Sequence, residues 1–277
     1  MLLIRNTLLW ALAAATLYAA VIQIFQPTFH KAPSAALTNR LFVENYVYGT
    51  PAPNIIAGSS MSQRMPAGAL GPGFTNLALS GGNALTGLAI AIRSPATPRH
   101  IFIEINRLSD AADDTLLRQT FDEPAFSLRR YIFALRKSYQ PLSVLYGVLR
   151  GSEREAPEPD LTESQRAGLI ADTAAKLQRP IPNDALARHM DELRALITQA
   201  EERGIRPVFF EMPIEPVLSQ SAQLVQLRAA VRTASPRACH LNIMIPGGAH
   251  TNDGIHLQIR DAREAAHAFR DFSGCPR

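Results

Sequence analysis

The sequence predicts an α/β fold in which a parallel sheet is covered by helices on both faces, preceded by one N-terminal transmembrane helix. Short apolar runs alternate with segments of helical spacing along most of the chain. Several of these runs are apolar on both faces, which is typical of the buried strands of a parallel sheet. Ahead of them lies a stretch of 19 residues without a charge, Thr7–Phe25. We expect a membrane anchor over residues 1–26, a linker and helix over 27–50, and an α/β domain over 51–277 with a helical insertion at about 110–182.

The N-terminal stretch, TLLWALAAATLYAAVIQIF, is long enough to cross a membrane. A helix of about 19 residues spans roughly 28 Å, close to the hydrocarbon thickness of a bilayer. A cleaved signal peptide and a buried soluble helix are the alternatives. The length of the run favours an uncleaved anchor, since no small-x-small cleavage motif follows it directly. The large body behind it favours an orientation with the N-terminus inside and the body outside, which we expect to be that of a single-pass inner-membrane protein with its body in the periplasm.

Composition and charge limit the classes of function that fit this protein. The 277 residues are 47% apolar, which is enough for a well-buried core. The net charge of +4 comes from 28 basic and 24 acidic residues that form no long block of one sign. This pattern argues against a nucleic-acid partner, because phosphate-binding surfaces cluster Lys and Arg.

Cofactor motifs are not found in the sequence. No strand-like run is followed by Gly-x-Gly-x-x-Gly, which argues against a dinucleotide-dependent oxidoreductase. His240 and His250 are not part of a zinc-ligand spacing, so we expect neither a metal nor a cofactor. Two cysteines, Cys239 and Cys275, either pair in an exported body or remain free thiols. A disulfide between them would contribute roughly 3 to 4 kcal/mol by chain entropy.

The individual elements follow from apolar spacing and from glycine or polar residues at their ends. Gly58 ends the first strand, Ser80-Gly81-Gly82 ends the second, and Gly204 stops a long helix that has Asn183 or Asp184 as its N-cap. The expected strands are Asn54–Ala57, Phe74–Leu79, His100–Ile105, Pro207–Met212 and Cys239–Ile245. The expected helices are Ala35–Tyr46, Ala84–Arg93, Asp184–Arg203, Ser221–Thr233 and Arg260–Phe272.

The helical insertion contains apolar residues beside arginines, as in the run FSLRRYIFALRK. One interpretation is a basic amphipathic helix that rests on lipid or on a membrane partner. The other is a helical insertion that packs on the sheet and leaves its arginines in solvent. We expect the second arrangement.

Polar residues at the strand ends can form a nucleophilic site. A catalytic serine needs a base, a group that orients the base, and N–H donors for the oxyanion. Ser60 follows the first strand, Gly81 follows the second, and Asp253 and His256 stand three residues apart near the start of the last helix. Because ligands bind at the carboxyl ends of parallel strands, we expect these residues to meet, with the carboxylate fixing the imidazole that faces the serine.

The order of these motifs resembles that of the SGNH, or GDSL-like, hydrolase superfamily. IIAGSSMS is similar to its first block, NLALSGGN to its second and DGIHL to its final Asp-x-x-His block, over roughly residues 50 to 110 and 205 to 272. The resemblance implies an SGNH-like three-layer sandwich. It also implies Ser60 as nucleophile, Asp253 and His256 as its partners, and the Ser60 and Gly81 N–H groups in the oxyanion hole. Ser59 occupies the place of the family's usual aspartate.

The third block departs from the family pattern. IFIEINRLS resembles the strand that ends in Gly-x-Asn-Asp, but Leu108 falls where the asparagine would align. Asn83 and Asn106 are the candidate side-chain donors to the oxyanion. A missing donor costs about 3 to 4 kcal/mol of transition-state stabilisation.

The Gly-Ser-Ser variant together with the anchor resembles one subgroup, the membrane-anchored SGNH-like proteins that O-acylate cell-surface polymers. These include alginate O-acetyltransferase-like proteins and the protein that assists D-alanyl transfer to teichoic acid. The resemblance implies a polysaccharide acceptor and an acyl donor delivered by a multi-pass membrane-bound O-acyltransferase. We therefore expect a serine acyltransferase or esterase. The alternative is a catalytically silent SGNH-like module that binds polysaccharide or scaffolds a secretion complex, which the altered third block favours.

Overall fold

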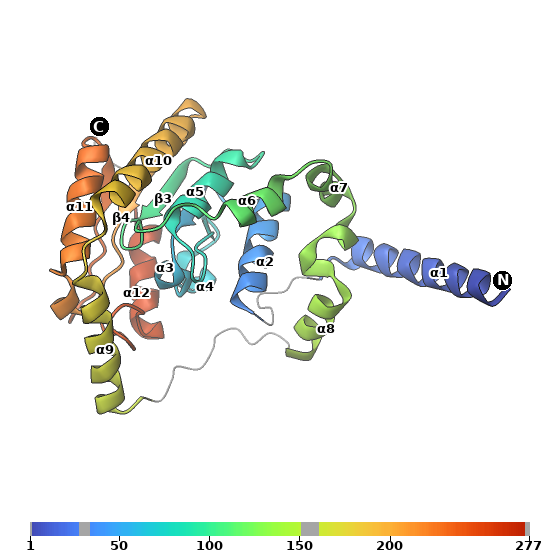
Figure 1. Cartoon of the computed structure of the whole chain (residues 1–277), viewed down its shortest axis with the longest axis horizontal. Coiled ribbons are helices and arrows are strands. Elements are labelled where there is room, and N and C mark those ends of the chain that lie inside the picture. The colour runs from blue at the N-terminus through green and yellow to red at the C-terminus, as the bar shows by residue number, and fades with distance from the viewer. Residues whose placement is uncertain (1, 28–33, 151–160, 275–277) are drawn as a thin grey trace. The chain divides into compact units, whose positions relative to one another are not determined.

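The computed structural model describes residues 2–27, 34–150 and 161–274 (Figure 1). The chain divides into two compact units. The first unit contains residues 1–49 and 118–156, and the second contains residues 50–117 and 157–277. Of the predicted insertion, residues 118–156 therefore belong with the N-terminal region, and residues 110–117 and 157–182 belong with the sheet.

The first unit is entirely helical in its described part. Helix α1 is long and apolar enough to cross a membrane, judged by length and composition. It lies within the expected anchor region of residues 1–26 and begins ahead of the charge-free run, at Leu2. Ser34 caps α2, since its hydroxyl accepts the N–H of Leu37. The elements are α1 (Leu2–Phe25), α2 (Ala35–Tyr48), α7 (Ala125–Tyr131), η1 (Phe133–Leu135), η2 (Lys137–Tyr139) and α8 (Pro141–Arg150), with α6 (Asp114–Phe121) leading into them.

The second unit is built on a five-stranded parallel sheet with the order β2-β1-β3-β4-β5. The predicted α/β class with a parallel sheet is confirmed. The strands are β1 (Asn54–Ala57), β2 (Phe74–Asn76), β3 (His100–Glu104), β4 (Arg206–Phe210) and β5 (Cys239–Leu241). The order reverses between β1 and β3, and such a switch point is where doubly wound sheets bind ligands.

Strand β1 has its predicted bounds, whereas β2 and β5 are shorter than predicted. In β2 the side chain of Asn76 accepts the N–H of Ala78 at 3.1 Å, which diverts the backbone. Pairing with the β1 segment nevertheless continues, because the N–H of Leu79 donates to the carbonyl of Gly58 at 3.0 Å. The residues after β1 and β2 are therefore kept side by side.

Helices cover the sheet, with α12 beside α4 and α10 beside α5 (Figure 1). The core on the α12 side is aromatic. The ring of Phe269 lies 5.3 Å from that of Phe102 on β3 and 4.9 Å from that of Phe210 on β4. Helix α5 approaches β1 closely, since a methyl group on Gly87 would lie 3.0 Å from the Cβ of Ala57. The helices are α3 (Ser60–Gln63), α4 (Ala67–Leu70), α5 (Ala84–Arg93), α9 (Glu163–Leu177), α10 (Asn183–Glu202), η3 (Pro216–Leu218), α11 (Ala222–Ala234) and α12 (Ile259–Arg270).

Three further expectations concern the two ends of α10 and the cysteines. The N-cap of α10 is Pro182, so the predicted cap at Asn183 or Asp184 is wrong by one or two residues. Both lie in the first turn, where the carboxylate of Asp184 bonds to Arg188 instead. Gly204 follows α10 with φ +73°, as its predicted role of helix stop requires. Cys239 is disulfide-bonded, and Cys275 lies outside the described residues.

Candidate functional site

The turn after β1 presents Ser60 at the start of a short helix. Ser59 is the N-cap of α3, and its hydroxyl accepts the N–H of Met61 at 3.2 Å. Ser60 is then the first helical residue, as expected for a strand that runs directly into a helix. Within the described ranges no protein group accepts the N–H of Ser60, so this donor is free for a ligand.

The hydroxyl of Ser60 meets the imidazole of His256. Their Oγ and Nε2 atoms are 2.8 Å apart. The other ring nitrogen, Nδ1, lies 2.6 Å from Oδ2 of Asp253, and the carboxylate also accepts the backbone N–H of His256 at 2.9 Å. The structure thus brings Ser60, His256 and Asp253 into one hydrogen-bonded series.

The charge on Asp253 decides the direction of these bonds. Burial alone would raise the pKa of this carboxyl, but the hydrogen bonds and charge of His256 outweigh it and hold the pKa at about 2. An ionised carboxylate only accepts, so Nδ1 of His256 carries the hydrogen. In the neutral imidazole Nε2 is then the acceptor and can take the proton of Ser60.

Asp253 and His256 lie in a loop rather than at a helix start, which corrects the expectation from sequence. Helix α12 begins only at Ile259. The loop is closed by an antiparallel bridge between Thr251 and Leu257, and the carbonyl of His256 accepts the N–H of Asn252 at 3.0 Å. The turn is tight because it passes through a glycine, Gly254, at φ +97°.

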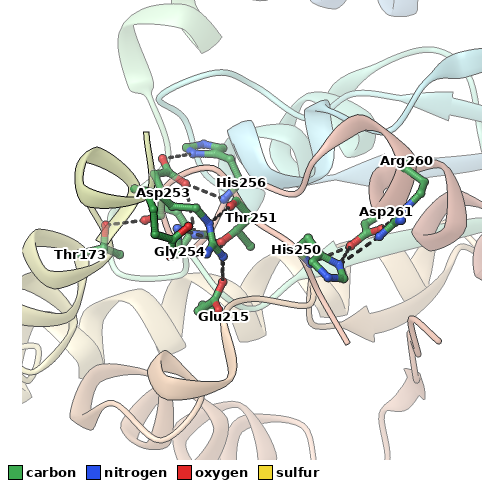
Figure 2. Close-up of polar contacts among 12 residues, drawn as sticks. Thr173, Glu215, His250, Thr251, Asp253, Gly254, His256, Arg260 and Asp261 are labelled. Carbon is green, nitrogen blue, oxygen red and sulfur yellow. Dashed lines mark hydrogen bonds and ion pairs between the residues drawn. The ribbon is translucent and has the colours of Figure 1, made fainter. Parts of the chain in front are cut away.

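A set of polar contacts from outside the loop fixes its backbone (Figure 2). Arg166 on α9 donates from Nε to the carbonyl of Thr251 and from a terminal nitrogen to Glu215, each at 2.8 Å. Glu215 also accepts the hydroxyl of Thr251 at 2.9 Å. The hydroxyl of Thr173 donates to the carbonyl of Asp253 at 3.0 Å. The orientation of the His256 ring therefore depends on α9 and on the segment after β4.

Glu104 is a site residue that the sequence interpretation missed. Its carboxylate is 0% exposed at the end of β3 and accepts four hydrogen bonds from the turn that carries Ser60. The hydroxyls of Ser59 and Ser62 each donate at 2.6 Å, and their backbone N–H groups donate at 3.0 and 3.3 Å. A methyl group on Gly58 would lie 2.6 Å from Oε2, so the carboxylate packs directly against the turn.

The acidic group beside Ser60 thus comes from β3, while residue 59 is a serine that binds it. Ser62 is a second hydroxyl donor to the same carboxylate. The signal in the sequence was a lone acid, Glu104, inside a strand predicted to be buried on both faces. A buried carboxylate needs several hydrogen-bond donors, and Ser59 and Ser62 supply them here.

Gly81 lies in the turn after β2, and the pairing of Leu79 with Gly58 keeps that turn beside the one that carries Ser60. Its φ is +67°, and an added methyl group would meet nothing within 4 Å. No group in the described part of the protein accepts its N–H. The backbone donors of Ser60 and Gly81 are therefore unpaired at neighbouring strand ends.

The two asparagines proposed as oxyanion donors are engaged elsewhere. Asn83 caps α5, and its amide nitrogen donates to the carbonyls of Asp110 and Ala111 at 3.0 and 2.7 Å. Both of its N–H groups are used, so the expectation that Asn83 serves the oxyanion is wrong. The amide of Asn106 exchanges two hydrogen bonds with the backbone of Met212, at 3.1 and 2.7 Å, which ties the end of β3 to the end of β4. One N–H of Asn106 has no acceptor among the described residues.

A second histidine–aspartate pair lies just outside this loop (Figure 2). Nδ1 of His250 is 2.9 Å from Oδ2 of Asp261, and Arg260 donates to the other carboxylate oxygen at 2.9 Å. No serine hydroxyl bonds to His250 in the parts of the chain that the structure describes. Those parts also contain no group of three His, Cys, Asp or Glu side chains arranged to hold a metal ion.

Comparison with known proteins adds no family assignment. No protein-family model matches the chain. No curated protein matches it significantly either. The geometry above and the sequence motifs are therefore the grounds for a functional proposal.

Proposed function

We propose that this protein is an SGNH-like serine acyltransferase or esterase. The observation that carries the proposal is the hydrogen-bonded series from Ser60 through His256 to Asp253. Support also comes from its place, because β1 and β3 flank the switch point of the sheet and Ser60 directly follows β1.

The first chemical step would be acylation of Ser60. Its Oγ attacks the carbonyl carbon of an ester while Nε2 of His256 takes the hydroxyl proton. The imidazolium that forms is stabilised by the ionised carboxylate of Asp253. His256 then donates its proton to the leaving alcohol, so the ester C–O bond breaks and an acyl-Ser60 remains. Each proton taken from a nucleophile is returned to a leaving group.

The oxyanion of the tetrahedral intermediate needs donors that are not already paired. The backbone N–H groups of Ser60 and Gly81 meet this condition, and Asn106 is the remaining side-chain candidate. In the second step His256 deprotonates an acceptor, which attacks the acyl-Ser60. A sugar hydroxyl as acceptor gives transfer, and water gives hydrolysis.

We also propose the setting of the reaction. The apolar helix α1 would act as an uncleaved anchor, with the sheet unit in the periplasm. An anchored site is close to a membrane-borne acyl donor, which favours transfer to a cell-surface or secreted polysaccharide over hydrolysis. The resemblance to polymer O-acylating proteins supports O-acetylation, with a multi-pass membrane-bound O-acyltransferase as partner.

The direct test is ester turnover by the detergent-solubilised full chain with p-nitrophenyl acetate. Ser60→Ala and His256→Ala should each lower kcat by about 10⁴-fold or more, because the series acts as a unit. His250→Ala is the matched control, since it removes a histidine from the other His–Asp pair and should leave turnover intact. A serine-reactive phosphonate provides a second readout. After treatment with it, intact-mass analysis should detect one phosphonate adduct in the unchanged protein and none in Ser60→Ala.

A second candidate is a catalytically silent SGNH-like module that binds or scaffolds polysaccharide. The commitment of Asn83 to α5 and the 110–111 backbone favours it, because one expected oxyanion donor is lost. This candidate predicts no ester turnover and no phosphonate adduct in the unchanged protein. This candidate is rejected if the unchanged protein shows ester turnover or a phosphonate adduct that Ser60→Ala lacks.

A further inference from the structure

Large apolar side chains are exposed in one segment of the first unit, residues 125–150, which we call the α7–α8 segment. Outside α1, the described part of the chain exposes twelve large apolar residues, and eight of them lie in this segment. They are Leu128, Tyr131, Ile132, Leu135, Leu142, Leu145, Val148 and Leu149. The other four, Leu169, Val217, Val225 and Met244, are scattered over the second unit. Scattered apolar residues are normal on a surface, but such a concentration marks an interaction site.

The α7–α8 segment is attached to the last two turns of α1. The hydroxyl of Tyr18 donates to the carbonyl of Tyr139 at 2.5 Å. The side-chain oxygen of Gln23 accepts the N–H of Phe133 at 3.2 Å. Ile22 is 2% exposed, whereas most other residues of α1 are exposed. The segment therefore packs on the part of α1 that precedes Phe25.

If α1 crosses a bilayer, these contacts with α1 fix the depth of the α7–α8 segment in the membrane. Its 24 residues extend for about 36 Å at 1.5 Å per residue, against a hydrocarbon thickness of about 30 Å. Tyr18 stands about 10 Å before the end of the helix along its axis. The backbone that Tyr18 binds then lies below the level of the headgroups. Interfacial helices bury their apolar faces about 5–10 Å into the same boundary.

Near the end of α7 and in η2, backbone N–H and C=O groups are hydrogen-bonded to protein side chains, as a location in lipid requires. The carboxylate of Glu44 on α2 accepts the N–H groups of Lys137 and Ser138, each at 2.8 Å. Arg136 is only 8% exposed and donates to the carbonyls of Arg129 and Arg130 at the end of α7. In water such groups could bond to solvent, but within a membrane each must find a protein partner.

We propose that the α7–α8 segment lies in the headgroup and acyl-chain boundary of the leaflet at the Phe25 end of α1. Lipid is the occupant that the observations favour, because the apolar side chains continue from a helix with the length and composition of a membrane span. Arg130 is an exposed residue, and its long side chain fits a guanidinium at the headgroup level of such a segment. The proposal rests on α1 crossing the bilayer and does not depend on the chemistry of Ser60.

The test places a single tryptophan in the segment. The chain has one tryptophan, Trp10 in α1, so Trp10→Phe provides a silent background. Leu149→Trp reports on α8, and Met244→Trp is a matched control in the second unit, since the two native side chains are 76% and 75% exposed. The full-length variants are reconstituted in phosphatidylcholine vesicles that carry bromine either near the carbonyls or near the chain ends.

Leu149→Trp should show blue-shifted emission and a loss of intensity that is larger with the shallow bromine. Met244→Trp should emit as in water and keep its intensity with both lipids. The proposal would be overturned if Leu149→Trp emitted at the same wavelength as Met244→Trp and neither variant were quenched by the brominated lipids. Protection of Leu149→Trp from both bromolipid and aqueous iodide would also overturn it, because a protein surface would then cover the segment.

Two further measurements keep the result interpretable. Leu142→Trp, at a position 71% exposed, repeats the test if Leu149→Trp fails to fold by circular dichroism. In the unchanged chain, Trp10 reports on α1 itself and should be quenched by the deep bromine. Quenching of Trp10 without quenching at residues 142 and 149 would leave α1 as an anchor and reject the segment as a lipid-bound element.

Discussion

The hydroxyl oxygen of Ser60 lies 2.8 Å from Nε2 of His256, although 196 residues separate them in the chain. The contact forms because the end of β1 and the loop before α12 meet at the same edge of the sheet. Asp253 holds the far side of the imidazole ring with a 2.6 Å contact to Nδ1. A serine hydroxyl, an imidazole and a carboxylate are thus aligned by two distant segments.

The orienting role of Asp253 can be isolated by Asp253→Asn. The amide would donate to Nδ1 of His256, so the hydrogen moves to Nε2, which can no longer accept from Ser60. We expect kcat for ester hydrolysis to fall by about 10⁴-fold with little change in KM. Steady-state kinetics with p-nitrophenyl acetate measures both constants. A kcat within about tenfold of the unchanged protein would contradict the assigned tautomer.

The lowered pKa of Asp253 predicts a pH dependence of stability. A pKa of 3.8 in the unfolded chain and about 2 in the folded protein corresponds to roughly 2 kcal/mol that favours folding. Because the pKa is depressed by folding, this contribution is complete above about pH 4 and is lost as the pH falls through about 2. The stability gap between the unchanged protein and Asp253→Asn in urea unfolding should shrink over that range. A gap that stays constant would count against the His256 contacts as its source.

The close packing of the turn that carries Ser60 predicts that Gly58→Ala is strongly destabilising. The new methyl group would lie 2.1 Å from Oγ of Ser62 and 2.6 Å from Oε2 of Glu104. We expect a loss of about 3 kcal/mol or more and impaired ester turnover, since Ser60 must shift with the turn. Gly68→Ala is the matched control, because an added methyl group there meets nothing within 4 Å. It lies in α4 and should raise stability by about 0.5–1 kcal/mol. Equal thermal unfolding of both variants would refute this account.

The buried carboxylate of Glu104 can be probed by two substitutions of different chemistry. In Glu104→Gln the amide oxygen can accept the bonds made to Oε2, and only the bond from the Ser59 hydroxyl must reverse. We expect a loss of about 1–2 kcal/mol. Glu104→Leu leaves four buried donors without an acceptor and should cost about 3–5 kcal/mol. Urea unfolding of the full chain measures both. If the two variants were equally stable, the hydrogen bonds would not be what holds the turn.

Local patterns predicted the parallel sheet unit well because its signals are short-range. β1 and α5 have their predicted bounds, and the glycine at 204 ends α10 as expected. Apolar runs and helix stops act within a few residues, so one sequence carries them in full. The lengths of β2 and β5 were overestimated, since apolar residues continue beyond Asn76 and Leu241, where the regular strands end.

The sequence by itself determined which residues are available at the strand ends, including Ser60, Gly81, Asp253 and His256. Only the tertiary structure decided what each of them touches. It joined Asn83 to the 110–111 backbone, placed the Asp253–His256 pair in a loop, and supplied Glu104 from β3 to the turn at Ser59. These contacts link segments that are far apart in the chain. Their partners are set by how the strands and loops pack, and a hydrogen bond requires a distance and an angle that residue spacing does not fix.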